Sequence, residues 1–233
     1  MRYTIISIDD SRAEGKYAIR NAMRNLDEAS VVSVNGYDSE SIKYARQTFP
    51  NLEPPGCGLN PGELGCWYSH MFCWKWSVGH DESLIVIEDD AIVSDDIDTL
   101  LDHYTEELPE YWDYICLHVP DNQLQDFNYR TVYDFNGAPG PVVNAGDPGY
   151  IYAIDGLNWI ARTYQGYSTA GIMYSPRGAA HLLKRVQFRK IAAPVDIFIY
   201  QDTHLGNLDG YAHRPETPRP VVVNHGLPQV IVR

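Results

Sequence analysis

The sequence predicts an α/β fold in which a single, mostly parallel, Rossmann-like sheet is flanked by helices. Short apolar runs alternate with amphipathic segments along the first half of the chain, a pattern typical of doubly wound sheets. One run, Leu84–Ile87, is apolar at every position, as in a strand buried on both faces. It leads directly into Glu88, Asp89 and Asp90, where ligands bind in open α/β sheets, beyond the carboxyl end of a strand.

The composition is that of an ordinary globular protein. The 233 residues are enough for one domain with a full core, and 44% of them are hydrophobic and 21% charged. The formal net charge of −13 disfavours nucleic-acid backbone and anionic lipid as partners. We find no signal-peptide core, no membrane-spanning run and no CxxC pair among the four cysteines. We therefore expect a cytoplasmic protein without a transmembrane segment, with reduced thiols.

The remaining elements follow from apolar periodicity and from turn residues. Strands are expected at residues 3–8, 31–34, 84–87, 114–119, 150–154 and 171–174, and helices at 9–26, 39–49, 61–78, 95–108, 176–186 and 196–205. The Asn35-Gly36 pair should form the turn that ends the second strand. Residues 120–148 are rich in Asn, Asp, Gly and Pro, and so long a connection is often a substrate loop or lid.

The helix over residues 61–78 has the strongest local signals. Asn60 should be its N-cap, with Pro61 in the first position and Glu63 in the third, which is a capping box. Its apolar residues recur three or four positions apart and predict one buried stripe: Leu64, Trp67, Met71, Trp74 and Val78. Ser94 should cap the helix over residues 95–108.

The three consecutive acids suggest a metal site. Adjacent carboxylates repel one another unless a cation offsets their charge, and hard divalent cations prefer oxygen ligands. The alternative is local: Asp89 and Asp90 open a turn, while Asp95 and Asp96 cap the following helix.

A second metal hypothesis concerns the long helix. Cys66, His70 and Cys73 share one face, because they are four and three residues apart, and they could bind zinc. No fourth ligand is evident, so buried structural thiols are the simpler interpretation.

Four segments together carry a resemblance to a known family. They are GELGCWYSH (Gly62–His70), VIEDDA (Val86–Ala91), STAGIMYSPRGAAHLL (Ser168–Leu183) and PVDIFI (Pro194–Ile199). Their order and spacing resemble glycosyltransferase family 25, over roughly residues 3–200. The resemblance implies a GT-A fold, a UDP-sugar donor carrying galactose or glucose, Mn²⁺ or Mg²⁺, and inversion at the anomeric carbon. Residues 1–119 would then bind the donor, and residues 120–233 would supply the acceptor site, lid and catalytic part.

The resemblance also implies roles for particular residues. Asp90 would ligate the metal, with Glu88 and His225 as further ligands, although His225 could equally be a surface residue of the tail. Asp196 would be the catalytic base, or else a helix N-cap, with Asp155 and Asp202 as the next candidates. The donor-binding candidates are Ser7, Arg12, Asn35, Gly36, Ser69, His70, Glu88 and Asp89.

Two competing functions stay open at this point. A catalytically inactive GT-A-like module that binds carbohydrate or calcium would keep the fold without turnover. A two-metal phosphohydrolase would need more His and Asp ligands than one strand end supplies. The expected partners are thus a nucleotide-sugar donor and a glycan or glycoconjugate acceptor.

Overall fold

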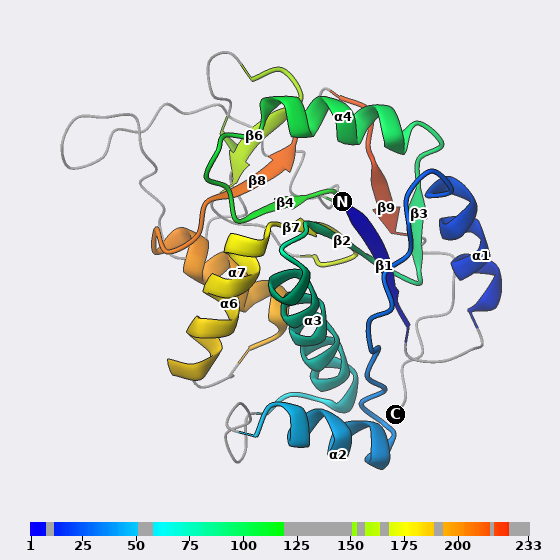
Figure 1. The fold of residues 1–233 in the computed structure, drawn as a ribbon, viewed down its shortest axis with the longest axis vertical. Helices are drawn as coiled ribbons and strands as arrows, with labels where there is room; N and C mark the ends of the chain where they lie inside the picture. Colours follow the sequence, from blue (N-terminus) through cyan, green and yellow to red (C-terminus); the bar gives the residue numbers. More distant parts are fainter. Residues whose placement is uncertain are drawn as a thin grey trace.

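A mixed sheet with helices on both faces forms the centre of the molecule (Figure 1). The computed structural model describes residues 1–7, 12–50, 58–118, 151–152, 157–163, 168–188, 193–214 and 217–223. Within these ranges, no helix combines the length and apolar character needed to cross a membrane.

Seven strands make up the main sheet. In spatial order they are β1 (Arg2–Ile6), β2 (Leu84–Glu88), β7 (Gly171–Tyr174), β4 (Tyr114–Cys116), β8 (Gly210–His213), β6 (Ile160–Thr163) and β5 (Ile151–Tyr152). The pairs β1–β2 and β4–β8 are parallel, and the other four pairs are antiparallel. Five strands therefore run in one direction, while β7 and β6 run in the other. The prediction of a mostly parallel sheet therefore holds only in part: most strands share one direction, but β7 and β6 run antiparallel to their neighbours, so the sheet is mixed.

Strand β2 divides the core into two layers. Leu84 and Val86 belong to the cluster that packs against one set of helices, and Ile85 and Ile87 belong to the other cluster. All four side chains are fully buried, which confirms the strand predicted from the continuous apolar run. Because successive side chains of a strand alternate between faces, the acids that follow are also directed to different layers.

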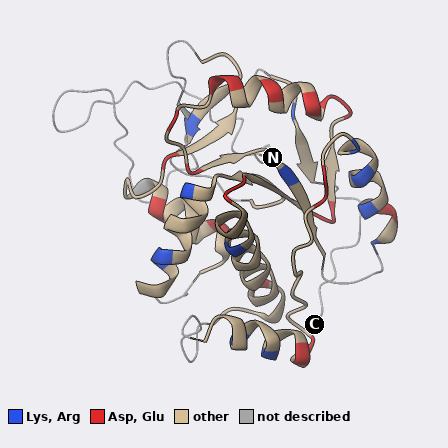
Figure 2. Ribbon diagram, viewed as in Figure 1, with Lys and Arg blue, Asp and Glu red and all other residues tan. Residues whose placement is uncertain are grey.

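The helices occupy both faces of the sheet. Those on the first face are α2 (Ser39–Thr48), α3 (Pro61–His80), α6 (Pro176–Phe188) and α7 (Val195–His204), and those on the second are α1 (Ala13–Ala22) and α4 (Ile97–Glu107). Figure 1 shows α3 between the sheet and α2, with α6 and α7 beside it. Figure 2 shows acidic residues along α4, and both basic and acidic residues on α1.

Helix α3 begins as its sequence predicts. The Asn60 side chain accepts a hydrogen bond from the Glu63 N–H (3.0 Å), and the Glu63 side chain accepts one from the Asn60 N–H (2.8 Å). The predicted buried stripe is confirmed at Trp67, Met71 and Trp74, but the burial of the helix is not limited to it. Val78 is 42% exposed near the end of the helix, whereas polar residues off the stripe, such as Ser69 and His70, are buried. Neighbours on several sides cover α3, so its burial does not follow one face.

The second predicted strand is absent. Residues 31–34 run beside β1 but form no strand ladder. The reason is that serine hydroxyls, and not a neighbouring strand, accept hydrogen bonds from backbone N–H groups of this segment. The Val34 N–H donates to Ser69 Oγ (2.8 Å), and the Asn35 N–H donates to Ser41 Oγ (3.1 Å).

The region after β2 also differs from expectation. Strands β3 (Ala91–Val93) and β9 (Val221–Val223) pair antiparallel in a second small sheet, which sequence periodicity did not predict. Asp89 and Asp90 form the turn between β2 and β3, so that part of the local alternative is confirmed. Ser94 is not the cap of α4. Asp96 holds the N-cap position without a side-chain bond, and Ser94 Oγ accepts from its N–H (3.3 Å).

Candidate functional site

The turn after β2 is held tightly against β1 and α1. The Asp89 N–H donates to the carbonyl oxygen of Ile6 (3.1 Å), at the end of the neighbouring strand. Helix α1 approaches from the other side at Gly15, where a Cβ atom would lie 2.6 Å from the Asp89 carbonyl oxygen. Only glycine permits so close a contact.

Asp89 is almost fully buried and has strong partners. Ser7 Oγ donates to its Oδ2 (2.6 Å), and Arg12 Nη1 donates to its Oδ1 (2.6 Å), while the residue is only 4% exposed. A carboxylate with a charged guanidinium and a hydroxyl is well satisfied. The predicted donor-binding residues Ser7, Arg12 and Asp89 thus come together, but they bind one another.

Asp90 has a different environment. Its side chain is 28% exposed, and its Oδ2 lies 3.7 Å from Arg12 Nη1. Its Oδ1 is buried, and among the residues with described positions it has no hydrogen-bond partner. A buried carboxylate oxygen without a donor is unfavourable, and a hard divalent cation would satisfy it. Asp90 therefore offers one oxygen ligand for a Mn²⁺ or Mg²⁺ ion.

Glu88 faces the layer of α3. Thr169 Oγ1 donates to Glu88 Oε1 (2.7 Å), and Cys66 Sγ lies 3.9 Å from the same oxygen. The pKa of Glu88 is raised to about 7, chiefly by burial and also by the nearby charges of Asp90 and Asp196, although the hydrogen bond from Thr169 lowers it. The structure thus separates the surroundings of Glu88 from those of Asp89, although the two are adjacent in sequence.

Asp196 is not an N-cap, because Pro194 holds that position and α7 begins at Val195. Its Oδ1 accepts a hydrogen bond from the Ile197 N–H (2.7 Å), and burial raises its pKa above the usual value for aspartate. Its charge also influences the pKa of Glu88, so the two carboxyl groups lie in one region.

Of the two reserve candidates for the base, Asp202 is the one that the structure describes, and its environment is less suitable. Asp202 is fully buried and paired with Arg185 Nε and Nη2 at 3.0 and 2.9 Å, as in a structural ion pair. Asp155 lies outside the described residues, as does His225.

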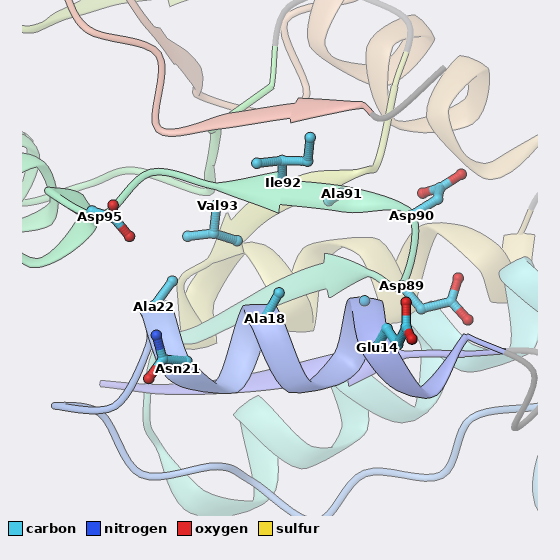
Figure 3. Close-up of a pocket in the computed structure, with 11 residues that line it drawn as sticks. Glu14, Ala18, Asn21, Ala22, Asp89, Asp90, Ala91, Ile92, Val93 and Asp95 are labelled. Carbon is cyan, nitrogen blue, oxygen red and sulfur yellow. The ribbon is translucent and has the colours of Figure 1, made fainter. Parts of the chain in front are cut away.

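Two cavities adjoin α1, and of these two the second is lined by Asp89 and Asp90. One, of about 430 Å³, lies between β1, α1 and residues 28–35, and its polar lining includes Ser7, Ser33, Asn35, Lys16 and Arg20. The other, of about 480 Å³, is a groove between α1 and β3. Figure 3 shows Asp89 and Asp90 at one end of this groove and Asp95 at the other. Sequence patterns did not identify Ser33 and Lys16, because they carry no motif.

Gly36 and Ser69 have structural explanations. A Cβ atom at Gly36 would collide with the carbonyl oxygen of Pro61, at the start of α3. Ser69 Oγ accepts from the Val34 N–H and donates to the Gly65 carbonyl oxygen (2.9 Å). Both residues therefore position Asn35 at the polar cavity by holding its segment against α3. Asn35 itself accepts from the Tyr37 N–H (2.9 Å).

His70 is completely buried. Its Nδ1 is hydrogen-bonded to the Tyr174 hydroxyl (2.9 Å), and burial lowers its pKa to about 3, so the ring is neutral. Its Nε2 has no hydrogen-bond partner within the described part of the chain.

These features define a class of protein: an α/β domain with acidic residues after a central strand and a polar cavity of nucleoside size that Ser7, a partner of Asp89, lines, as in nucleotide-dependent transferases. The family model of glycosyltransferase family 25 (LPS biosynthesis protein) matches residues 4–199, which is most of the chain. The chain belongs to glycosyltransferase family 25, and it is a glycosyltransferase of glycan or lipopolysaccharide biosynthesis. A search of curated proteins gives no match.

Proposed function

We propose that this protein is a metal-dependent, inverting hexosyltransferase with a GT-A fold. It would move galactose or glucose from a UDP-sugar to a hydroxyl of a glycan or glycoconjugate. The observation that carries the proposal is the buried Oδ1 of Asp90 after β2, which has no hydrogen-bond partner among the described residues. A polar cavity of about 430 Å³ lies nearby, lined by Ser7, which also bonds Asp89. The family membership supports transfer of a sugar, and the site suggests how the donor is held.

The diphosphate of the donor would lie near Asp90. Asp90 would hold Mn²⁺ or Mg²⁺, with His225 as a further candidate ligand; Glu88, which the resemblance also suggested, faces the α3 side of β2 instead. A divalent cation at this position offsets the charge that develops on the departing diphosphate. Arg12 also lies here, but Asp89 already occupies its Nη1 at 2.6 Å.

The nucleoside would occupy the polar cavity. Ser7, Ser33 and Asn35 offer hydroxyl and amide groups there, and Lys16 adds positive charge. Such groups can hydrogen-bond a base and a ribose. The close contact between Gly36 and α3 keeps this lining in place.

Asp196 would act as the base. The acceptor hydroxyl attacks the anomeric carbon, its proton passes to the Asp196 carboxylate, and the bond from that carbon to the diphosphate oxygen breaks. A base works best when its pKa lies near the operating pH. The upward shift of the Asp196 pKa that burial produces is in that direction.

The test compares donor binding with and without the cation. Thermal shift of the wild type with UDP-galactose, UDP-glucose or GDP-mannose should show stabilisation by a UDP-sugar that depends on Mn²⁺. Asp90→Asn should lose that dependence, while Asp95→Asn, at the far end of the same groove, should keep it. Equal, Mn²⁺-dependent stabilisation of Asp90→Asn would contradict the metal assignment.

Turnover is measured separately. Slow hydrolysis of the UDP-sugar in Mn²⁺, or transfer to a glycan acceptor, should occur in the wild type and disappear in excess chelator. Donor binding without either reaction would instead favour the inactive carbohydrate-binding module.

A further inference from the structure

A second group of metal-ligating side chains lies on the α3 side of β2. Cys66 and His70 are one helical turn apart on α3, and Glu88 ends the neighbouring strand. One ligand atom from each residue (the thiol sulfur, a ring nitrogen and a carboxylate oxygen) lies within 4.8 Å of the other two. Cys73, which the helical spacing also suggested, is not part of this group; Glu88 takes its place.

His70 supplies an independent indication of a ligand. The side chain is fully buried, and its Nε2 has no hydrogen-bond partner among the described residues. A buried ring nitrogen without a partner is costly, and neutral imidazole is a common metal ligand. The Tyr174 hydroxyl binds the opposite nitrogen, Nδ1, at 2.9 Å. Metal-bound histidines usually have such an outer partner, which fixes the ring.

The distances suit a small tetrahedral ion. Ligand atoms about 2.0–2.3 Å from zinc lie roughly 3.5 Å from one another. Cys66 Sγ and Glu88 Oε1 are already 3.9 Å apart, and the whole group needs to contract by about 1 Å. Thr169 Oγ1, 2.7 Å from the same carboxylate oxygen, holds Glu88 in place.

We propose that Cys66, His70 and Glu88 bind a Zn²⁺ ion, at a site separate from the cation position at Asp90. A thiolate and an imidazole favour Zn²⁺ over Mn²⁺ or Mg²⁺, which prefer oxygen ligands alone. Three protein ligands leave one coordination position for water or another small ligand. Because the ligands come from α3 and from β2, the ion would join this helix to the strand that leads into Asp89 and Asp90.

Cobalt(II) is the probe for the test, since a thiolate bound to Co²⁺ gives a charge-transfer absorption in the near ultraviolet. The full chain, purified under reducing conditions, is titrated with Co²⁺ and then with Zn²⁺. The absorption should appear with Co²⁺ and disappear as Zn²⁺ replaces it, and Zn²⁺ should raise the melting temperature. Absence of the absorption in the wild type would overturn the proposal.

Variants locate the ligands. Cys66→Ser should abolish the absorption, whereas Cys73→Ser, a buried thiol on the same helix, should keep it. Loss in Cys73→Ser with retention in Cys66→Ser would overturn the assignment. Should Cys66→Ser fail to fold, Glu88→Gln and Tyr174→Phe decide: both should weaken Co²⁺ binding, Tyr174→Phe by about 10–100-fold. Unchanged affinity in both would likewise overturn it.

This test is independent of the proposed transferase chemistry. Asp90→Asn should lose the Mn²⁺ dependence of donor binding yet keep the thiolate absorption. Failure of one result therefore leaves the other intact.

Discussion

Neighbouring acids have opposite surroundings on the two sides of β2. Toward α1, Asp89 is buried but paired with Arg12 and Ser7 at 2.6 Å. Toward α3, Glu88 has a threonine hydroxyl and a thiol as neighbours, and its pKa rises to about 7. Asp89 is buried and Glu88 half-buried, and of the two only Asp89 has a cation within hydrogen-bond distance in the described part of the chain.

The difference shows how one acidic run can serve several purposes. A paired carboxylate is a structural anchor, since its charge is already satisfied. A buried carboxyl group without a cation is available to a proton, a metal ion or a substrate hydroxyl. Asp90 lies between these two states: its Oδ2 is 3.7 Å from Arg12 Nη1, and its Oδ1 has no hydrogen-bond partner among the described residues.

The largest expected effect is the loss of turnover on substitution of Asp196, whose charge raises the pKa of Glu88 on the α3 side of β2. Asp196→Asn keeps the shape but cannot accept a proton, so turnover should fall about 10²–10⁴-fold with the KM for the donor nearly unchanged. Steady-state kinetics measures both constants. Transfer at close to the wild-type rate would show that another group is the base.

The next largest effect is a difference in stability between substitutions of Asp89 and of Asp90. Asp89→Ala leaves the largely buried guanidinium of Arg12 without its main partner, and we expect a loss of about 3 kcal/mol in the free energy of unfolding. Asp90→Ala removes a partly exposed carboxylate and should cost much less. Urea unfolding of the two variants measures the difference. Similar losses of stability would mean that the ion pair with Arg12 does not make Asp89 more important than Asp90.

His213 tests whether a pKa shifted mainly by burial, as for Glu88, makes stability depend on pH. It ends β8, and burial lowers its pKa to about 4 from the usual 6.5. Because the folded state resists protonation, this histidine's contribution to stability is complete above pH 6.5 and is lost as the pH falls toward 4. His213→Gln should therefore reduce the fall in unfolding free energy between pH 6.5 and 4. His80→Gln, at an exposed position, should leave the fall unchanged, and an unchanged fall in both variants would contradict the explanation.

The smallest effect concerns the support of the polar cavity. Ser69→Ala removes the acceptor for the buried Val34 N–H and should cost about 1–3 kcal/mol of stability, toward the low end if water replaces the hydroxyl. Donor affinity should fall only slightly, because Ser69 acts by positioning Asn35. Thermal unfolding and donor titration measure the two effects; a large loss of affinity with unchanged stability would instead indicate direct contact with the donor.

The sequence alone was sufficient for the features that depend on local interactions. The capping box at Asn60 and the strand at Leu84–Ile87, with acids at its carboxyl end, were both predicted. Each depends on residues close together in the chain. The family was also evident from its motifs, and the family model confirms it.

Tertiary structure decided the features that depend on distant partners. The hydroxyl of Ser69 takes the backbone bond that residues 31–34 would need for a strand, and β9 pairs with β3 from more than a hundred residues away. Likewise, helical spacing grouped Cys66 and His70 with Cys73, whereas the fold brings Glu88 to them from β2. Hydrogen bonding and charge act through space over a few ångströms. The residue type therefore indicates which bonds a side chain can form, and the packing of distant segments decides which of them it forms.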